Sequence, residues 1–245
     1  MALSPVDLAL VAAAVLLGAG TQRVTGLGFG LVSAPFLVLL LGPFHGVVLA
    51  NALGLFTSVT VLVQVWRRVD LRRFALLAVP AAVAIAPGAW LALTVSGPVL
   101  SVVVGSVAFL AILAVVSSER MRVFRGRGGG VAAGGLSGFM NVTAGVGGPA
   151  ITLYALSTAW EHRSFVATAQ LYFAVVSGAS LLAKGWPVLA PTAWAVVLGG
   201  LVVGVVAGTA LSWRIPASRA QKLVAALALA GSLATVAKGV VAVAA

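Results

Sequence analysis

The sequence predicts an all-α polytopic membrane protein made of two inverted repeats, each a broken or re-entrant helical hairpin followed by three full transmembrane helices. Three observations predict this fold: the apolar composition, the lengths of the apolar segments and the positions of the basic residues. Of the 245 residues, 62% are hydrophobic and 8% are charged, and the mean hydropathy is +1.18. A soluble domain carries about 25% charged residues, so this chain cannot cover a soluble surface.

The apolar segments fall into two length classes. A helix that crosses a bilayer needs ~20 residues. Six segments reach that length: 45–66, 73–95, 98–117, 163–184, 190–211 and 222–243. Four others are shorter and come as two pairs: 5–20 with 28–41, and 129–140 with 149–160. We expect each pair to form a hairpin that either re-enters the membrane or spans it with short helices.

A glycine-rich break separates the two segments of each short pair. The first is Thr25-Gly26-Leu27-Gly28-Phe29-Gly30, and the second is Thr143-Ala144-Gly145-Val146-Gly147-Gly148-Pro149. A helix that restarts after such a break presents unpaired N–H groups and a partial positive charge, and glycine lets the backbone approach a ligand. Pro149 fits the first turn of the second restarted helix, where its missing N–H costs nothing. The two breaks therefore predict a binding site for a small anion.

The basic residues predict the orientation of the chain. Three clusters, at 67–73, 120–127 and 214–222, lie between apolar segments, where the positive-inside rule assigns them to the cytoplasm. The second hairpin then begins and ends in the cytoplasm, and the first begins and ends outside, together with both chain termini. Lys184 is an exception, because it falls on the external side. Basic residues that cluster between apolar segments also argue against nucleic acid as a partner for this chain of net charge +11.

The two halves match at a nearly constant spacing. Gly26-Leu27-Gly28 precedes Gly145-Val146-Gly147 by 119 residues, and Asn51 precedes Gln170 by the same distance. We therefore expect a first transmembrane repeat at 1–117, a basic cytoplasmic linker at 118–128 and a second repeat at 129–245. Each repeat crosses the membrane an odd number of times after its hairpin, so the second is inverted. Paired breaks in inverted halves are typical of a transport site near the middle of the bilayer.

The candidate substrate-binding residues lie in the breaks or on the long helices that follow them. Asn51 and Gln170 can hydrogen-bond a buried oxyanion without a desolvated charge, or they can bond neighbouring helices instead. Arg23 either binds the ligand or lies at the membrane surface. Gly199, Gly200, Gly204 and Gly208 are instead expected to pack helices closely. The predicted site comprises Arg23, Thr25, Gly26, Gly28, Gly30, Asn51, Asn141, Thr143, Gly145, Gly147, Gly148, Gln170 and Tyr172.

The sequence offers no candidate groups for an enzyme. There is no cysteine, and the only histidines, His45 and His162, lie far apart at segment ends. We therefore expect no catalytic residue, no metal and no cofactor. The acidic residues also fall near segment ends, so the carboxylate that commonly couples transport to protons or sodium is missing. A proton or sodium co-substrate, a passive anion channel and a homodimer all stay open, whereas a non-transporting scaffold would need no paired breaks.

These residues resemble the TauE/SafE family of sulfite-exporter-like permeases. The likeness lies in Gly26-Leu27-Gly28-Phe29-Gly30, Ala34-Pro35 and Ala50-Asn51, in Val69-Asp70-Leu71-Arg72-Arg73 with Pro87-Gly88, and in Gly135-Leu136-Ser137-Gly138 followed by Gly145-Val146-Gly147-Gly148-Pro149. It covers nearly the whole chain. The resemblance implies a multi-pass permease of the inner cell membrane that moves small sulfur-containing anions, such as sulfite or an organosulfonate, often outward.

Overall fold

The computed structural model describes residues 3–25, 29–116, 124–212 and 217–244. These residues form helices joined by short loops, as the sequence predicts. The helices are α1 (Pro5–Thr25), α2 (Phe29–Leu41), α3 (Pro43–Val65), the 3-10 turn η1 (Trp66–Arg68), α4 (Leu71–Thr94), α5 (Gly97–Val116), α6 (Gly126–Ala144), α7 (Gly148–Ser157), α8 (His162–Lys184), α9 (Pro191–Ser212) and α10 (Ala217–Ala244).

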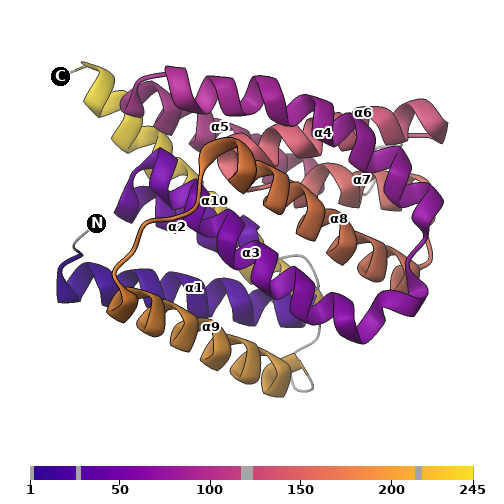
Figure 1. Cartoon of the computed structure of the whole chain (residues 1–245), viewed down its shortest axis with the longest axis horizontal. Coiled ribbons are helices and arrows are strands. Elements are labelled where there is room, and N and C mark those ends of the chain that lie inside the picture. The colour runs from indigo at the N-terminus through magenta and orange to yellow at the C-terminus, as the bar shows by residue number, and fades with distance from the viewer. Residues whose placement is uncertain (1–2, 26–28, 117–123, 213–216, 245) are drawn as a thin grey trace.

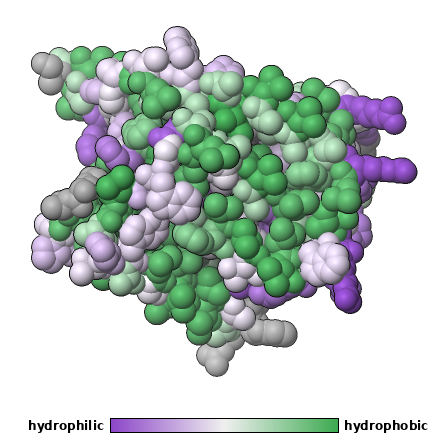
Figure 2. Space-filling view, in the orientation of Figure 1, coloured by the Kyte–Doolittle hydropathy of each residue, from purple (hydrophilic) through white to green (hydrophobic). Residues whose placement is uncertain are grey.

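The helices lie roughly along one direction, as expected for a bundle in a bilayer (Figure 1). Within the described ranges, seven of them are long and apolar enough to cross a membrane. Both termini lie at one end of the bundle. Exposed arginines follow α3 and open α4, α6 and α8, and hydrophilic side chains gather at the end of the bundle opposite the termini (Figure 2). Hydrophobic side chains cover most of the surface between the two ends, where lipid would lie.

The lengths of two predicted short segments are wrong. The segment 5–20 becomes α1, which is 21 residues long and can span the membrane. The segment 129–140 becomes α6, which is 19 residues long and begins inside the predicted linker. Both helices continue through polar residues where the apolar run ends, since in a membrane the helix satisfies every backbone group. Only α2, with 13 residues, and α7, with 10, are short.

Glycines bring three helix pairs into close contact. A Cβ added at Gly204 would overlap the Leu16 carbonyl between α9 and α1, and one at Gly134 would overlap the Leu77 carbonyl between α6 and α4. Gly105 is similarly close to Ser232 between α5 and α10. The predicted packing role is confirmed for Gly200, Gly204 and Gly208. It is wrong for Gly199, around which a Cβ would meet nothing within 4 Å, because this residue faces away from α1.

The helix boundaries of the two halves coincide at the spacing noted in the sequence. The helices α3 and α8 are both 23 residues long and contact each other at the centre of the bundle (Figure 1). At this spacing α1 corresponds to α6, and α4 corresponds to α9. The contact between α4 and α6 is therefore the counterpart of the contact between α9 and α1, and the structure has both. The inverted relation itself stays a prediction that this pattern supports. The boundaries 119 residues apart are Thr25 with Ala144, Phe29 with Gly148, Pro43 with His162, and Val65 with Lys184.

We expect Gly204→Leu to lower the melting temperature of the purified protein by several degrees, because the side chain would force α1 and α9 apart. Overpacking of this kind costs about 1–3 kcal/mol. Gly199→Leu is the matched control on the same helix and should melt like the parent chain. Thermal unfolding in detergent measures both, and equal melting temperatures for the two variants would contradict the packing role.

Candidate functional site

The two glycine-rich breaks meet inside the bundle. Helix α6 ends at Ala144, and Gly145 then adopts a left-handed conformation with φ of 70°, which favours glycine. After Gly147, the chain restarts as α7 with Pro149 in its first turn, as predicted. At the start of α2, a Cβ on Gly30 would overlap the carbonyl oxygen of Gly145. The first turn of α2 therefore touches the α6–α7 break directly.

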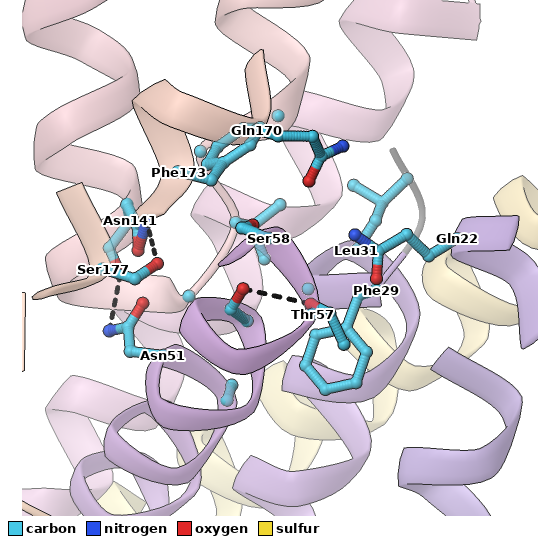
Figure 3. Close-up of a pocket in the computed structure, with 17 residues that line it drawn as sticks. Gln22, Phe29, Leu31, Asn51, Thr57, Ser58, Asn141, Gln170, Phe173 and Ser177 are labelled. Atoms are coloured by element: carbon cyan, nitrogen blue, oxygen red, sulfur yellow. Dashed lines mark hydrogen bonds between the residues drawn. The ribbon is translucent and has the colours of Figure 1, made fainter. Parts of the chain in front are cut away.

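A pocket of about 50 Å³ lies at this junction (Figure 3). The starts of both α2 and α7 contribute to its wall, so the positive ends of two helices face one small space. On a scale of ~10–15 Å³ per water, this volume holds a few water-sized groups, which suits a small ion. The lining residues are Gln22, Phe29, Gly30, Leu31, Ala50, Asn51, Gly54, Thr57, Ser58, Asn141, Gly145, Val146, Gly147, Gly148, Gln170, Phe173 and Ser177.

Several polar side chains line the pocket, but none of its lining residues is charged. On one side, Asn51 Nδ2 donates to the carbonyl oxygen of Asn141 at 3.4 Å, and Asn141 Nδ2 donates to Ser177 Oγ at 3.5 Å. Gln22 and Gln170 lie on the other side (Figure 3). Asn51, Asn141 and Gln170 are at most 3% exposed. The groups that this pocket could offer to a ligand are therefore hydrogen-bonding side chains and helix ends.

Two side-chain oxygens in this pocket have no hydrogen-bond partner. They are Asn141 Oδ1 and Gln170 Oε1, and both are buried. A buried polar group without a partner costs about 1–3 kcal/mol, so native structures rarely retain one without a reason. An amide can turn over to present its NH2 group in place of its oxygen, which would supply donors to an anion. The two unpartnered oxygens thus mark the side chains whose hydrogen bonding a ligand would complete.

The structure brings most of the predicted site together. Gly30, Asn51, Asn141, Gly145, Gly147, Gly148 and Gln170 line the pocket. Gly26 and Gly28 lie outside the described residues, and Thr25 is described only as the last residue of α1.

Three predicted residues point elsewhere. Arg23 lies against Gly208 of α9. The Thr143 hydroxyl donates to the Phe139 carbonyl of its own helix at 2.6 Å, and the Tyr172 hydroxyl donates to Gly134 of α6 at 3.3 Å. Gln22 and Ser177, which the predicted site omitted, line the pocket, whereas the predicted Arg23 and Tyr172 of the same two helices do not. A signal for Ser177 was present, because it follows Gln170 by two helical turns on the same face.

The remaining polar positions follow the expectations from sequence. His45 and His162 are exposed at helix ends. Asp70 and Glu161 cap the starts of α4 and α8, with each carboxylate accepting two backbone N–H groups. At Glu161, the backbone N–H groups of Arg163 and Ser164 hold the pKa of the carboxyl below its usual value. In the described part of the chain, every carboxylate therefore lies away from the pocket.

The arrangement of a buried pocket between two helix breaks in a multi-pass bundle agrees with a comparison with known protein families. The family model described as "Sulfite exporter TauE/SafE" matches residues 10–235. The chain belongs to the sulfite exporter TauE/SafE family. This is a family of membrane transporters, and both breaks and every pocket residue fall inside the matched range. Comparisons with curated proteins and with solved structures found no match.

We expect Gly30→Ala to destabilise this TauE/SafE family member, because the added methyl group would push α2 away from the Gly145 carbonyl. The cost of such overpacking is about 1–3 kcal/mol, measured as a lower melting temperature. Gly178→Ala on α8 is the control, since a Cβ there meets nothing within 4 Å. If the Gly30 variant were as stable as the control variant, the direct contact between the breaks would be refuted.

Proposed function

We propose that this chain is a secondary transporter that exports a small sulfur-containing anion, such as sulfite, across the inner cell membrane. The single observation that carries the proposal is the pocket in which two helix starts converge with two buried amides whose oxygens have no partner. Membership of the sulfite exporter family supports the same class of substrate. The pocket volume suits a compact ion of one sulfur and three oxygens better than a longer organosulfonate.

The neutral pocket suits transport because a transporter must release what it binds. The amides of Asn141 and Gln170, with the backbone N–H groups at the starts of α2 and α7, would replace part of the hydration shell of the anion. A charged side chain among them would hold a desolvated anion more strongly and slow its release. The absence of charge among the lining residues is therefore consistent with moderate affinity.

Movement would follow from the two-part construction of the chain. Alternating access requires the pocket to open to one side of the membrane and then to the other while two rigid bodies rock around it. The halves 1–117 and 129–245 are our candidates, since each supplies one helix break to the pocket. None of the described carboxylates lines the pocket. A co-transported proton would therefore be carried by the anion itself. A co-transported sodium ion would have to be bound by backbone carbonyl or side-chain amide oxygens.

A passive anion channel is the second candidate, and the distance of the described carboxylates from the pocket is the observation in its favour. A counterflow experiment distinguishes a transporter from a channel. We expect unlabelled sulfite inside proteoliposomes to accelerate the uptake of radiolabelled sulfite, because alternating access exchanges one ion for another. Uptake that is unaffected by internal sulfite and does not saturate would favour the channel. Protein-free liposomes give the background, and no sulfite flux in any gradient would reject the proposal.

We expect Gln170→Leu to reduce sulfite flux at least about tenfold while leaving the melting temperature unchanged or raised. The physical reason is that Gln170 Oε1 has no protein partner, so removing the amide breaks no hydrogen bond to that atom and would deprive only the ligand. Gln64→Leu on α3 is the matched control, because Gln64 is exposed and bonds only within its own helix, to the Thr60 carbonyl. Normal flux with lowered stability in the Gln170 variant would make that residue a structural one.

A further inference from the structure

A second cavity, of about 300 Å³, lies toward the end of the bundle that holds the chain termini, which we assign to the external side. It is formed by the end of α2, the start of α3, and the end of α8 with the segment that follows. Its rim is open, since Trp186 is 51% exposed and Val188 is 80% exposed. The lining residues are Leu41, Phe44, His45, Val48, Leu49, Lys184, Trp186, Pro187, Val188 and Leu189. We call this space the outer cavity.

Lys184 is the charged residue of the outer cavity. It is 9% exposed, which is rare for a lysine unless the ammonium has an anionic partner. Its Nζ donates to the carbonyl oxygen of Val142, near the end of α6. None of the acidic side chains that the structure describes forms an ion pair with it. In its protonated form, the Lys184 ammonium would attract an anion into this cavity, since no described acidic side chain neutralises it.

Lys184 is also connected to the pocket between the breaks. Val142, which accepts its hydrogen bond, is adjacent to Asn141 of the pocket wall. On α8, Gln170, Ser177 and Lys184 follow one another every seventh residue, so they lie on one face with ~10 Å between successive side chains. On α3, Leu49 lines the outer cavity and the next residue lines the pocket. Both spaces therefore lie along the same seam between α3 and α8.

The matching halves differ where the outer cavity lies. At the cytoplasmic end, the Asp70 N–H at the start of α4 donates to Thr168 Oγ1 of α8 at 2.9 Å. The Arg73 guanidinium stacks over the Trp160 ring, 4.5 Å from its centroid, and reinforces this contact. Asp70 and Thr168 are related to Leu189 and Leu49 by the spacing of 119 residues. Those counterparts line the outer cavity, so a cavity at the outer end takes the place of the α4–α8 contact at the cytoplasmic end.

From these contacts we infer that the outer cavity is an external binding site for a small inorganic anion, with Lys184 as its charged ligand, through which the anion passes to or from the pocket. This inference rests on the proposed transport function for its place in the path. An anion there competes with the Val142 carbonyl for the ammonium group. Anion binding would thereby weaken the hydrogen bond from Lys184 to the Val142 carbonyl near the end of α6, one residue from Asn141.

Binding is tested first, without transport. The protein is placed in nanodiscs of phosphatidylcholine and titrated with sodium sulfite, and the fluorescence of Trp186 is obtained as the difference from Trp186→Phe. A saturable change is expected. Lys184→Gln should weaken it at least about tenfold, since the amide keeps a donor for the Val142 carbonyl and loses only the charge. Lys184→Arg should retain the change. Lys238→Gln is the matched control, because that lysine is exposed and donates to the Leu39 carbonyl at 2.8 Å, away from the cavity.

Sided transport is tested second. In oriented proteoliposomes, Lys184→Gln should raise the half-saturating sulfite concentration at the external face about tenfold and change that at the cytoplasmic face by less than about twofold. The two proposals fail separately. A fluorescence change without flux in the parent chain would reject transport and keep the outer site. Flux with no fluorescence change would reject the outer site and keep transport.

Three results overturn the inference. A fluorescence change that survives in Lys184→Gln removes the lysine from the site. Loss of the change on adding phosphatidylglycerol would assign the cavity to an anionic lipid headgroup. Loss of flux at both faces together with a lower melting temperature, not rescued by Lys184→Arg, would limit Lys184 to its bond with the Val142 carbonyl.

Discussion

A helix that ends inside a bilayer leaves backbone carbonyl groups that water cannot reach, and the rest of this structure depends on how they are satisfied. At the end of α6, the Asn141 carbonyl accepts from the Gly145 N–H and from Asn51. Lys184 donates to the Val142 carbonyl, and the Ser137 hydroxyl donates to the Gly147 carbonyl at 2.7 Å. The break is therefore held by α3, α6 and α8 together.

The same requirement explains why glycine recurs where helices meet. Between lipid-embedded helices there is little hydrophobic gain, so close backbone approach and hydrogen bonds supply the contact energy. Gly134 and Gly204 allow this approach in the two outer pairs, α4–α6 and α1–α9. The central α3–α8 seam is different, because polar side chains line part of it and it leaves two cavities. Each outer pair joins a helix of one half to a helix of the other, so the proposed rocking motion would have to slide the helices of these pairs past each other.

Charge is distributed along α8 in a way that suits an anion path. Arg163 lies at the end that we predict to be cytoplasmic and Lys184 at the predicted external end, while Gln170 and Ser177 lie between them, all seven residues apart. A charged residue in mid-membrane is costly, whereas amides and hydroxyls there need only hydrogen-bond partners. Cations at the ends would attract an anion, and neutral groups in the middle would bind it loosely enough to release it.

The sequence by itself determined the membrane class, the two helix breaks and most helix boundaries, because these depend on composition and on the local chemistry of glycine and proline. It also predicted that Asn51, Asn141 and Gln170 are candidate ligand groups, and all three line one pocket. Only the tertiary structure decided which side of each helix faces that pocket. Gln22 lines it where Arg23 does not, and Ser177 lines it where Tyr172 bonds α6 instead. The physical reason is that these helices are apolar on nearly every side, so their rotation is set by glycine contacts with neighbouring helices and leaves little periodic signal in the sequence.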